Sequence, residues 1–538
     1  MAKVLVADEI SPEGINIMKS ALEVDYIPDV SAEQLLEIIP QYEGLLVRSR
    51  CKVPRSVLEK GKALRIVGRA GVGVDNIDLQ AATELGVLVI NSPEGNTASA
   101  AEHTLALMLS LARMIPAADL SMRQGKWERN KFLGSELFNK TLGIVGLGKI
   151  GSRVAQCGIA LGMKVNSYDP FMSVERAKEL GVRLVSLDEI WAHSDFITVH
   201  TPKTRDTANL LNAEVFDRIK PGVRIVNAAR GGIIDEAALA DAILSGKVAG
   251  AGLDVFAEEP PTDSPLLKVA DKLVLTPHLG ASTHEAQFNV AIDIAEQIRD
   301  YLSGKHVRSP VNLPSMRPEI MQALGKFVWL AEAMGAIAGE FLRGNIRKLN
   351  IGVGGSLAEK DTAPLAVAAL RGLFGARMEG VTYVNAQIVA KNHGVHVTQS
   401  STEASSKRDE ITMKLEGDAG SSNLTGTVLG QDEPIITRIN DFPVNLAPQK
   451  YMLFTSHQDQ PGMVARVAGI LGKFDINIST MSVARRGSRE EAVMVLGLDD
   501  PLTPELVAEV GDSSGIHFAR FVSLDHLPKE LFGERNGN

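Results

Sequence analysis

An arginine, a glutamate and a histidine each follow an apolar stretch of the sequence and could act together on one small molecule. Arg230 lies between Ala229 and two glycines, where its guanidinium could clamp a carboxylate with two hydrogen bonds. A carboxylate such as Glu259, bonded to a histidine such as His278, fixes the imidazole tautomer and produces a general acid or base. Glu258 is equally acidic and stays an alternative partner for the histidine. This set suits hydride and proton exchange between a hydroxyl and a carbonyl carbon.

A glycine-rich segment indicates where a dinucleotide would bind. Gly146, Gly148 and Gly151 form a Gly-x-Gly-x-x-Gly pattern after an apolar stretch and before a helical pattern. Such glycines allow a tight turn and let the backbone approach a pyrophosphate at a helix N-terminus. Asp169 ends the next apolar stretch, where a carboxylate binds the adenosine ribose and repels a 2′-phosphate, which favours NAD over NADP. The alternatives are an ordinary strand-to-helix turn and a turn-forming aspartate before Pro170.

These residues need a scaffold of parallel strands, and the hydrophobic pattern predicts one. Short apolar strands alternate with amphipathic helical windows over residues 3–92 and again over 141–276, where six strands are expected. Alternation of this kind is typical of parallel sheets covered by helices on both faces. An apolar helix is expected at 98–113, and a helix at 283–302 would return the chain to the first domain.

The predicted fold class is α/β, with two doubly wound parallel-sheet domains, an α+β domain and a ferredoxin-like βαββαβ domain. We expect a discontinuous substrate-binding domain at 1–97 and 286–314, a Rossmann domain at 98–285, an intervening domain at 315–447 and a terminal domain at 448–526. The length of 538 residues supports several domains, because a single core rarely exceeds about 300 residues.

Composition argues against several classes of function. The net charge is −9 and the basic residues are scattered, which disfavours nucleic acid or an anionic membrane as a partner. Two cysteines, Cys51 and Cys157, are too few for a disulfide framework or a thiolate metal site, so we expect no metal and a cytoplasmic location. No apolar stretch approaches the ~20 residues that cross a bilayer, and the N-terminus shows no signal-peptide pattern.

The motifs around Arg230, Glu259 and His278 resemble those of the D-isomer-specific 2-hydroxyacid dehydrogenase family. The resemblance implies that the arginine binds the substrate carboxylate and carbonyl, that the glutamate supports the histidine, and that the histidine transfers the proton. It also implies NAD as the cofactor. The residues that it assigns to the cofactor site are Gly146, Gly148, Lys149, Ile150, Gly151, Asp169, Thr201, Ala228, Ala229, Arg230, Asp254, His278, Gly280 and Ala281.

The whole chain resembles the long members of this family, which act on a phosphorylated substrate. The implied reaction is NAD-dependent oxidation of 3-phospho-D-glycerate to 3-phosphohydroxypyruvate, the first step of L-serine biosynthesis. Surplus arginines in an acidic protein suit that phosphate. The resemblance assigns substrate contacts to Arg48, Arg69, Val72 and Asn96, and also to Arg129 and Lys131 from a neighbouring subunit.

The terminal domain resembles an ACT-type amino-acid-binding domain through the segment 457–462. The resemblance implies that paired edges of two subunits bind an effector, for which L-serine is the candidate. The implied effector residues are His457, Asp459, Gly462 and Asn477. A domain that serves only for oligomerisation stays an alternative. We expect a homo-oligomer, either a dimer or a tetramer.

Two other functions use the same scaffold. A glyoxylate or hydroxypyruvate reductase would carry the same Arg230, Glu259 and His278, but it needs neither phosphate-binding arginines nor a regulatory domain. An NAD-sensing regulatory protein belongs to a different class, and fold alone does not exclude it. This chain has both of the features that a reductase does not need, and its appended ACT-like domain favours metabolic regulation over an NAD-sensing protein.

Overall fold

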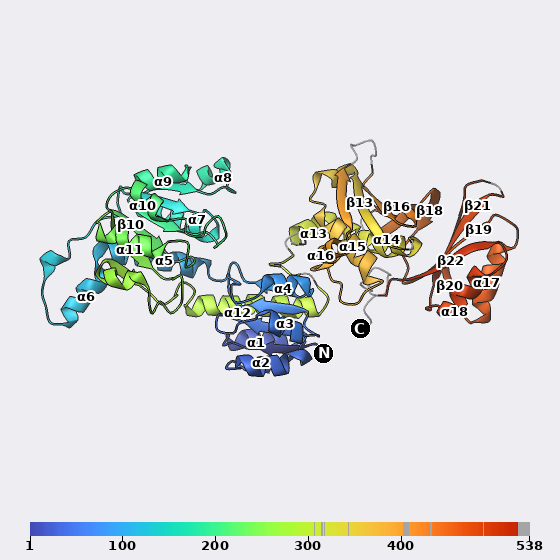
Figure 1. Ribbon diagram of the computed structural model, residues 1–538, viewed down its shortest axis with the longest axis horizontal. Helices are drawn as coiled ribbons and strands as arrows, with labels where there is room; N and C mark the ends of the chain where they lie inside the picture. Colours follow the sequence, from blue (N-terminus) through green and yellow to red (C-terminus); the bar gives the residue numbers. More distant parts are fainter. Residues whose placement is uncertain are drawn as a thin grey trace.

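Four sheets, each with its own helices, follow one another along the chain (Figure 1). The structure is a computed structural model that describes residues 1–305, 307–313, 316, 318–342, 344–401, 408–430, 433–487 and 489–525. The predicted fold class is confirmed, because two parallel sheets are followed by a mixed sheet and an antiparallel sheet. The predicted domain limits at 314, 315 and 526 lie outside the described residues, and the domain boundaries stay predictions.

The first sheet has five parallel strands in the order β2-β1-β3-β4-β5. The strands are β1 (Lys3–Val6), β2 (Glu23–Tyr26), β3 (Gly44–Val47), β4 (Ile66–Arg69) and β5 (Leu88–Asn91). The helices between them are α1 (Pro12–Lys19), α2 (Ala32–Ile38), α3 (Arg55–Lys60) and α4 (Leu79–Glu84). The hydrophobic pattern does not predict β2, because this edge strand is not buried and lacks an apolar run.

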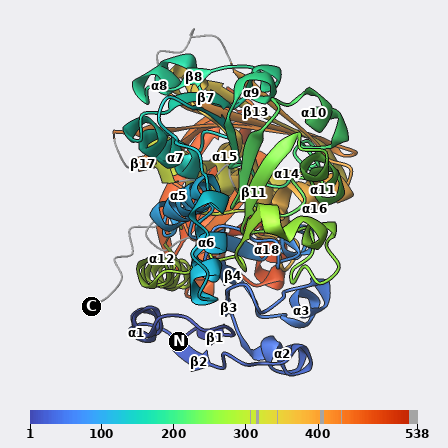
Figure 2. The ribbon, with the colours of Figure 1, turned by 90° about the vertical axis from the view of Figure 1, so that its left-hand side faces the viewer.

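Helix α12 (His284–Leu302) returns the chain to the first domain, in agreement with the sequence pattern. Its residues Val290, Ile294 and Ile298 are buried in one core with Val4 and Ile66 of the first sheet. Figure 2 shows the five-stranded unit below the seven-stranded unit described next.

The second sheet has seven parallel strands in the order β12-β11-β10-β9-β6-β7-β8. The strands are β6 (Thr141–Val145), β7 (Lys164–Tyr168), β8 (Arg183–Leu184), β9 (Phe196–Val199), β10 (Val223–Asn227), β11 (Val248–Leu253) and β12 (Leu273–Leu275). The predicted number of six was one too low, because β8 has only two residues and gives no apolar run. The strand order reverses between β6 and β9, and ligands of such sheets bind outside the carboxyl ends of the strands there.

The helices of the second unit are α5 (Thr97–Arg113), α6 (Ile115–Arg123), α7 (Lys149–Ala160), α8 (Val174–Glu179), α9 (Leu187–His193), α10 (Ala213–Arg218) and α11 (Glu236–Leu244). Helix α5 buries Leu107, Met108 and Ala112 in one core with the strands of this sheet. Helix α6 belongs to an arm that projects away from the rest of the unit (Figure 1).

The third sheet has six strands in the order β14-β13-β15-β16-β17-β18, of which β13 and β14 are parallel and the other pairs antiparallel. The strands are β13 (Ile346–Gly354), β14 (His396–Ser401), β15 (Glu410–Gly417), β16 (Gly420–Leu429), β17 (Glu433–Ile439) and β18 (Phe442–Leu446). The helices are α13 (Pro318–Leu324), α14 (Phe327–Phe341), α15 (Ala363–Gly375) and α16 (Ala386–Asn392).

The fourth sheet is antiparallel, with the order β20-β21-β19-β22. Its elements run β19 (Tyr451–Gln458), α17 (Met463–Lys473), β20 (Ile478–Arg485), β21 (Glu491–Leu498), α18 (Pro504–Gly511) and β22 (Ile516–Ser523), which is the predicted βαββαβ order. The ring of Phe454 packs edge-on against Phe341 of α14, with centroids 5.2 Å apart, so the last two units share buried surface.

No single helix in the described part of the chain is long and apolar enough to cross a membrane, although the bent pair α5 and α6 passes a test of length and composition. The same residues contain no group of three or more histidine, cysteine, aspartate or glutamate side chains that could hold a metal ion.

Candidate active site

A cavity of about 980 Å³ lies between the first two units. Arg48 and Arg69 line it from the five-stranded unit, and Glu259 and His278 line it from the seven-stranded unit. The N-terminal half of α12, from His284 to Ala291, completes its wall. The fold therefore brings two of the three predicted reacting residues into one cavity with two of the predicted substrate contacts.

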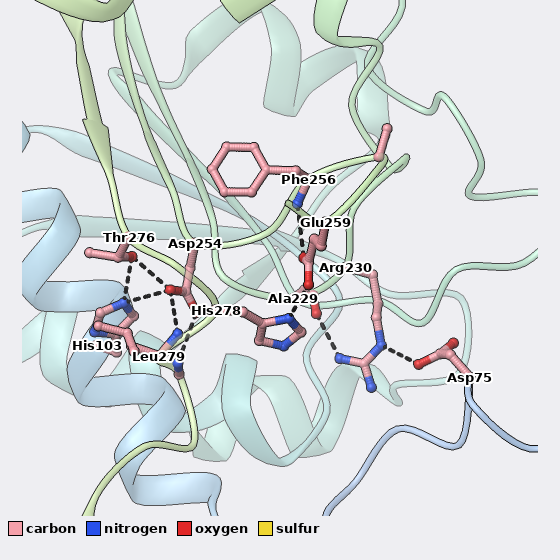
Figure 3. Close-up of polar contacts among 12 residues, drawn as sticks. Asp75, His103, Ala229, Arg230, Asp254, Phe256, Glu259, Thr276, His278 and Leu279 are labelled. Atoms are coloured by element: carbon pink, nitrogen blue, oxygen red, sulfur yellow. Dashed lines mark hydrogen bonds and ion pairs between the residues drawn. The ribbon is translucent and has the colours of Figure 1, made fainter. Parts of the chain in front are cut away.

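His278 and Glu259 form a hydrogen-bonded pair at the ends of two neighbouring strands (Figure 3). Nδ1 of the histidine lies 2.8 Å from Oε2 of the glutamate, and the backbone N–H of Phe256 donates to the other carboxylate oxygen at 3.1 Å. Because a carboxylate can only accept, Nδ1 carries the proton of this bond. The imidazole is half exposed, so Nε2 remains available to a substrate. Glu259, rather than Glu258, is the partner.

Arg230 follows β10 and is oriented by two contacts (Figure 3). Its Nε donates to Oδ2 of Asp75 at 3.2 Å, and its Nη1 donates to the carbonyl oxygen of Ala229 at 2.7 Å. A Cβ atom at Gly73 would lie 2.0 Å from Nη2, so only glycine allows the guanidinium to approach this loop. Asp75 comes from the five-stranded unit and was not among the predicted site residues.

Arg69 is a half-buried cation near two others. Its Nε has no hydrogen-bond partner in the described part of the chain. Burial and then the neighbouring guanidinium groups of Arg230 and Arg48 lower the pKa of Arg69 to about 10, so it remains charged at neutral pH. Three arginines held this close to one another are a site for an anion with more than one negative charge.

The predicted substrate contacts Val72 and Asn96 are not part of the cavity wall. The carbonyl oxygen of Val72 accepts a hydrogen bond from Nδ2 of Asn91 at 2.6 Å. Asn96 precedes α5 without capping it, and its Oδ1 is buried with no partner among the described residues.

The glycine turn fits a dinucleotide. Gly146 has φ 95°, and a Cβ there would lie 2.7 Å from the carbonyl oxygen of His200. A Cβ at Gly151 would lie 2.1 Å from the carbonyl oxygen of Gly146, whereas one at Gly148 would meet nothing within 4 Å. The first and third glycines are therefore required for packing, and the middle one leaves open space at the start of α7, where a pyrophosphate could lie against backbone N–H groups.

Other predicted cofactor residues surround this turn. Asp169 accepts hydrogen bonds from the backbone N–H groups of Leu147 at 2.7 Å and Phe171 at 2.8 Å, which holds its carboxylate against the turn. Oγ1 of Thr201 is buried without a partner in the described residues. Lys149 opens α7 and pairs with Glu94 at 2.5 Å. Ile150 is half-buried.

Asp254 lies at the end of β11 and is fully buried. Burial acts to raise the pKa of Asp254, but hydrogen bonds from His103, Thr276 and two backbone N–H groups outweigh it and keep the pKa below its usual value. The two backbone groups belong to Leu279 and Gly280, so this carboxylate also shapes the loop after His278. His103 was not among the predicted site residues, because a single histidine in an apolar helix pattern carries no motif.

Two more cofactor candidates lie on the same loops. Ala281 lines the cavity, and the carbonyl oxygen of Ala228 faces Gly280. Ala229 accepts the hydrogen bond from Arg230 described above.

Arg129 and Lys131 do not line the cavity of their own chain. They form a short 3-10 helix on the projecting arm, and both are exposed. The arm, residues 114–138, also exposes large apolar side chains, and Leu133 is 90% exposed. The exposed apolar residues of the arm are Ile115, Leu120, Met122, Trp127, Leu133 and Phe138.

Among the predicted effector residues of the fourth sheet, Asp459 and Asn477 are hydrogen-bonded and His457 is buried, whereas Gly462 is exposed. Oδ2 of Asp459 accepts from Arg485 at 3.2 Å and from the backbone N–H of Arg489 at 3.0 Å. His457 is buried, and burial lowers its pKa. Gly462 has φ 89° and precedes α17.

Asn477 and Asp459 lie at opposite ends of this sheet. Tyr451, the first residue of β19, pairs with Leu498, and Ile478 of β20 pairs with the same residue. Asn477 is therefore level with the start of β19, whereas Asp459 follows its end. At about 3.3 Å per residue, the length of β19 separates the two side chains by more than a small ligand spans. One chain alone cannot place both on one amino acid.

Comparison with known proteins identifies the domains. Residues 105–280 match the family described as D-isomer specific 2-hydroxyacid dehydrogenase, NAD binding domain. Residues 323–440 match the D-3-phosphoglycerate dehydrogenase intervening domain, and residues 451–513 match the ACT domain.

The relatives cover nearly the whole chain. A D-3-phosphoglycerate dehydrogenase of Synechocystis sp. is 48% identical over 97% of this chain and 95% of its own length. A D-3-phosphoglycerate dehydrogenase of Archaeoglobus fulgidus is 46% identical over 97% of this chain and all of its own length. Among solved structures, a D-lactate dehydrogenase of Aquifex aeolicus in complex with NAD and lactic acid is 30% identical and covers 56% of this chain and 96% of its own, with a TM-score of 0.51. Given this identity and these three domains in order, the chain belongs to the D-3-phosphoglycerate dehydrogenase family, in its long form with an intervening and an ACT domain.

Proposed function

We propose that the protein oxidises 3-phospho-D-glycerate to 3-phosphohydroxypyruvate with NAD, the first step of L-serine biosynthesis. The observation that carries the proposal is the His278–Glu259 pair in a cavity that also contains Arg48 and Arg69. The pair supplies a proton acceptor, and Arg48 and Arg69 supply a site for the phosphate.

Each residue has a defined part in this reaction. Nε2 of His278 accepts the hydroxyl proton, and Glu259 stabilises the imidazolium that results. Arg230 binds the substrate carboxylate through Nη2, because its Nε and Nη1 are already bound to Asp75 and Ala229. NAD, held by the glycine turn and Asp169, would supply the hydride acceptor.

Arg48 and Arg69 bind the phosphate and distinguish this substrate from smaller acids. The unpartnered, buried Nε of Arg69 gains a hydrogen-bond partner only when an anion arrives. A glyoxylate or hydroxypyruvate reductase would have no use for this buried charge. We also propose NAD rather than NADP, because Asp169 places a negative charge where a 2′-phosphate would lie.

A homo-oligomer completes the site in this proposal. The exposed apolar side chains of the arm form a surface that a second copy of the chain would cover. Such a copy would carry Arg129 and Lys131 to the cavity of its neighbour. Light scattering would distinguish a dimer from a tetramer.

L-serine is the proposed effector of the ACT domain. Because Asp459 and Asn477 lie at opposite ends of one sheet, the proposed binding site is formed by the paired edges of two subunits. We keep the cytoplasm as the proposed location, which agrees with two unpaired cysteines.

The decisive experiment compares initial rates of NADH oxidation with 3-phosphohydroxypyruvate, hydroxypyruvate and glyoxylate, each with and without L-serine. A strong preference for the phosphorylated keto acid supports the proposed substrate. Equal or better rates with the small keto acids would instead identify a reductase, and unchanged rates with L-serine would remove the proposed effector.

A further inference from the structure

A hydrogen-bonded cluster lies behind the loop that carries His278. Figure 3 shows His103, Thr276 and Asp254 on one side of His278, and Glu259 on the other. His103 comes from α5, more than 150 positions before the strand ends that it contacts. Its Nε2 lies 3.1 Å from Oδ1 of Asp254 and 3.0 Å from Oγ1 of Thr276.

The proton positions in this cluster follow from its acceptors. Asp254 is ionised at neutral pH, because its hydrogen bonds keep its pKa below the usual value, and a carboxylate only accepts. The Thr276 hydroxyl lies 2.6 Å from Oδ1 of Asp254 and donates its single proton there. Both neighbours of Nε2 therefore act as acceptors toward His103, so Nε2 carries a proton that the two oxygens share.

The cluster determines the shape of the loop after β12. Asp254 accepts from the backbone N–H of Leu279 at 2.7 Å and of Gly280 at 2.8 Å, and its carbonyl oxygen accepts from the N–H of His278 at 2.9 Å. His278 itself has φ 55°. A left-handed conformation is unfavourable for a residue other than glycine, so surrounding contacts must maintain it.

We propose that His103 is a positioning residue for the proton transfer. By donating to Asp254 and Thr276, its Nε2–H ties α5 to the loop 276–280 and holds His278 in the conformation that presents Nε2 to the cavity. His103 acts through other residues, because its side-chain hydrogen bonds are to Asp254 and Thr276 and neither of these is a reacting group. This inference rests on the proposed function, in which His278 is the acid–base group.

A matched pair of variants separates the hydrogen bond from the volume of the side chain. His103→Gln keeps an N–H donor at a similar reach, whereas His103→Met has a similar length and no donor. We expect kcat near the wild-type value for His103→Gln, and a loss of about tenfold to hundredfold for His103→Met, since small displacements of a reacting group cost this much. The KM for the phosphorylated substrate should stay near wild type in both, because the arginine contacts are unchanged.

Amide hydrogen exchange of the free protein provides a readout that does not depend on the reaction. The amides of Leu279 and Gly280 should exchange faster in His103→Met than in wild type, and His103→Gln should restore their protection. Equal kcat and equal exchange in the two variants would overturn the role of His103. The two proposals can fail separately. If the wild-type protein does not act on the phosphorylated substrate while the two variants show the expected exchange pattern, the proposed function is overturned and the structural role of His103 stands.

A second substitution tests the bridging hydroxyl. Thr276→Val removes the group that accepts from His103 and donates to Asp254, with little change of volume. In the double variant, the losses of kcat caused by Thr276→Val and His103→Met should not be additive, because both substitutions break the same hydrogen-bond network. Fully additive losses would contradict a shared network.

Discussion

Nδ1 of His278 lies 2.8 Å from Oε2 of Glu259, although 19 positions separate the two residues in the chain. The pair is formed because β11 and β12 are parallel neighbours, so their carboxyl ends meet at one edge of the sheet. The remaining imidazole nitrogen is left for a substrate in the cavity.

Removing the imidazole should lower turnover severely and spare cofactor binding. His278→Ala should lower kcat by about 10²-fold to 10⁴-fold, the usual contribution of a general acid or base. Its affinity for NADH, measured by fluorescence titration, should stay near wild type because the glycine turn is unchanged. Normal turnover in this variant would refute the acid–base role of His278.

Arg69 should matter for the phosphorylated substrate only. Arg69→Ala removes hydrogen bonds to a charged group worth about 1.5–3 kcal/mol, so KM for 3-phosphohydroxypyruvate should rise about tenfold or more. The kinetics with unphosphorylated hydroxypyruvate should change little. Arg176→Ala, on the exposed surface of α8, is the control. An equal rise in KM for both keto acids would indicate that Arg69 binds the substrate carboxylate instead.

Asp75 should act through Arg230 on every substrate of the site. Asp75→Asn weakens the support at Nε while Ala229 still holds Nη1, so the guanidinium turns more freely. We expect KM to rise for phosphorylated and unphosphorylated keto acids alike, which steady-state kinetics with both would show. A loss confined to the phosphorylated acid would mean that Asp75 affects the phosphate site.

Asp254 should stabilise the protein in a pH-dependent way. Its folded-state pKa is lowered, so the stabilisation is complete above the unfolded value of about 3.9 and is lost as pH falls through the folded pKa. Asp254→Asn should therefore lower the melting temperature at pH 7, and the difference from wild type should shrink below about pH 4. Melting curves from pH 3 to 8 test this, and a difference that does not depend on pH would contradict it.

The hydrophobic pattern determines most of the fold. Alternating apolar strands and amphipathic helices predict both parallel sheets, because each strand buried on two faces must be continuously apolar. The pattern misses β2 and β8, since an exposed edge strand and a two-residue strand bury too little to leave a signal. The predicted helix at 98–113 agrees with α5 within one residue.

The sequence by itself determined the chemical set, because Arg230, Glu259, His278 and the glycine turn lie within short motifs whose spacing has a local physical reason. Only the tertiary structure decided which other side chains hold these residues in place. Asp75 reaches Arg230 across 155 positions and His103 reaches Asp254 across 151, so no local pattern could reveal either contact. Likewise, Asp459 and Asn477 are close in the chain but lie at opposite ends of one sheet, because strand pairing sets distance in space independently of distance in sequence.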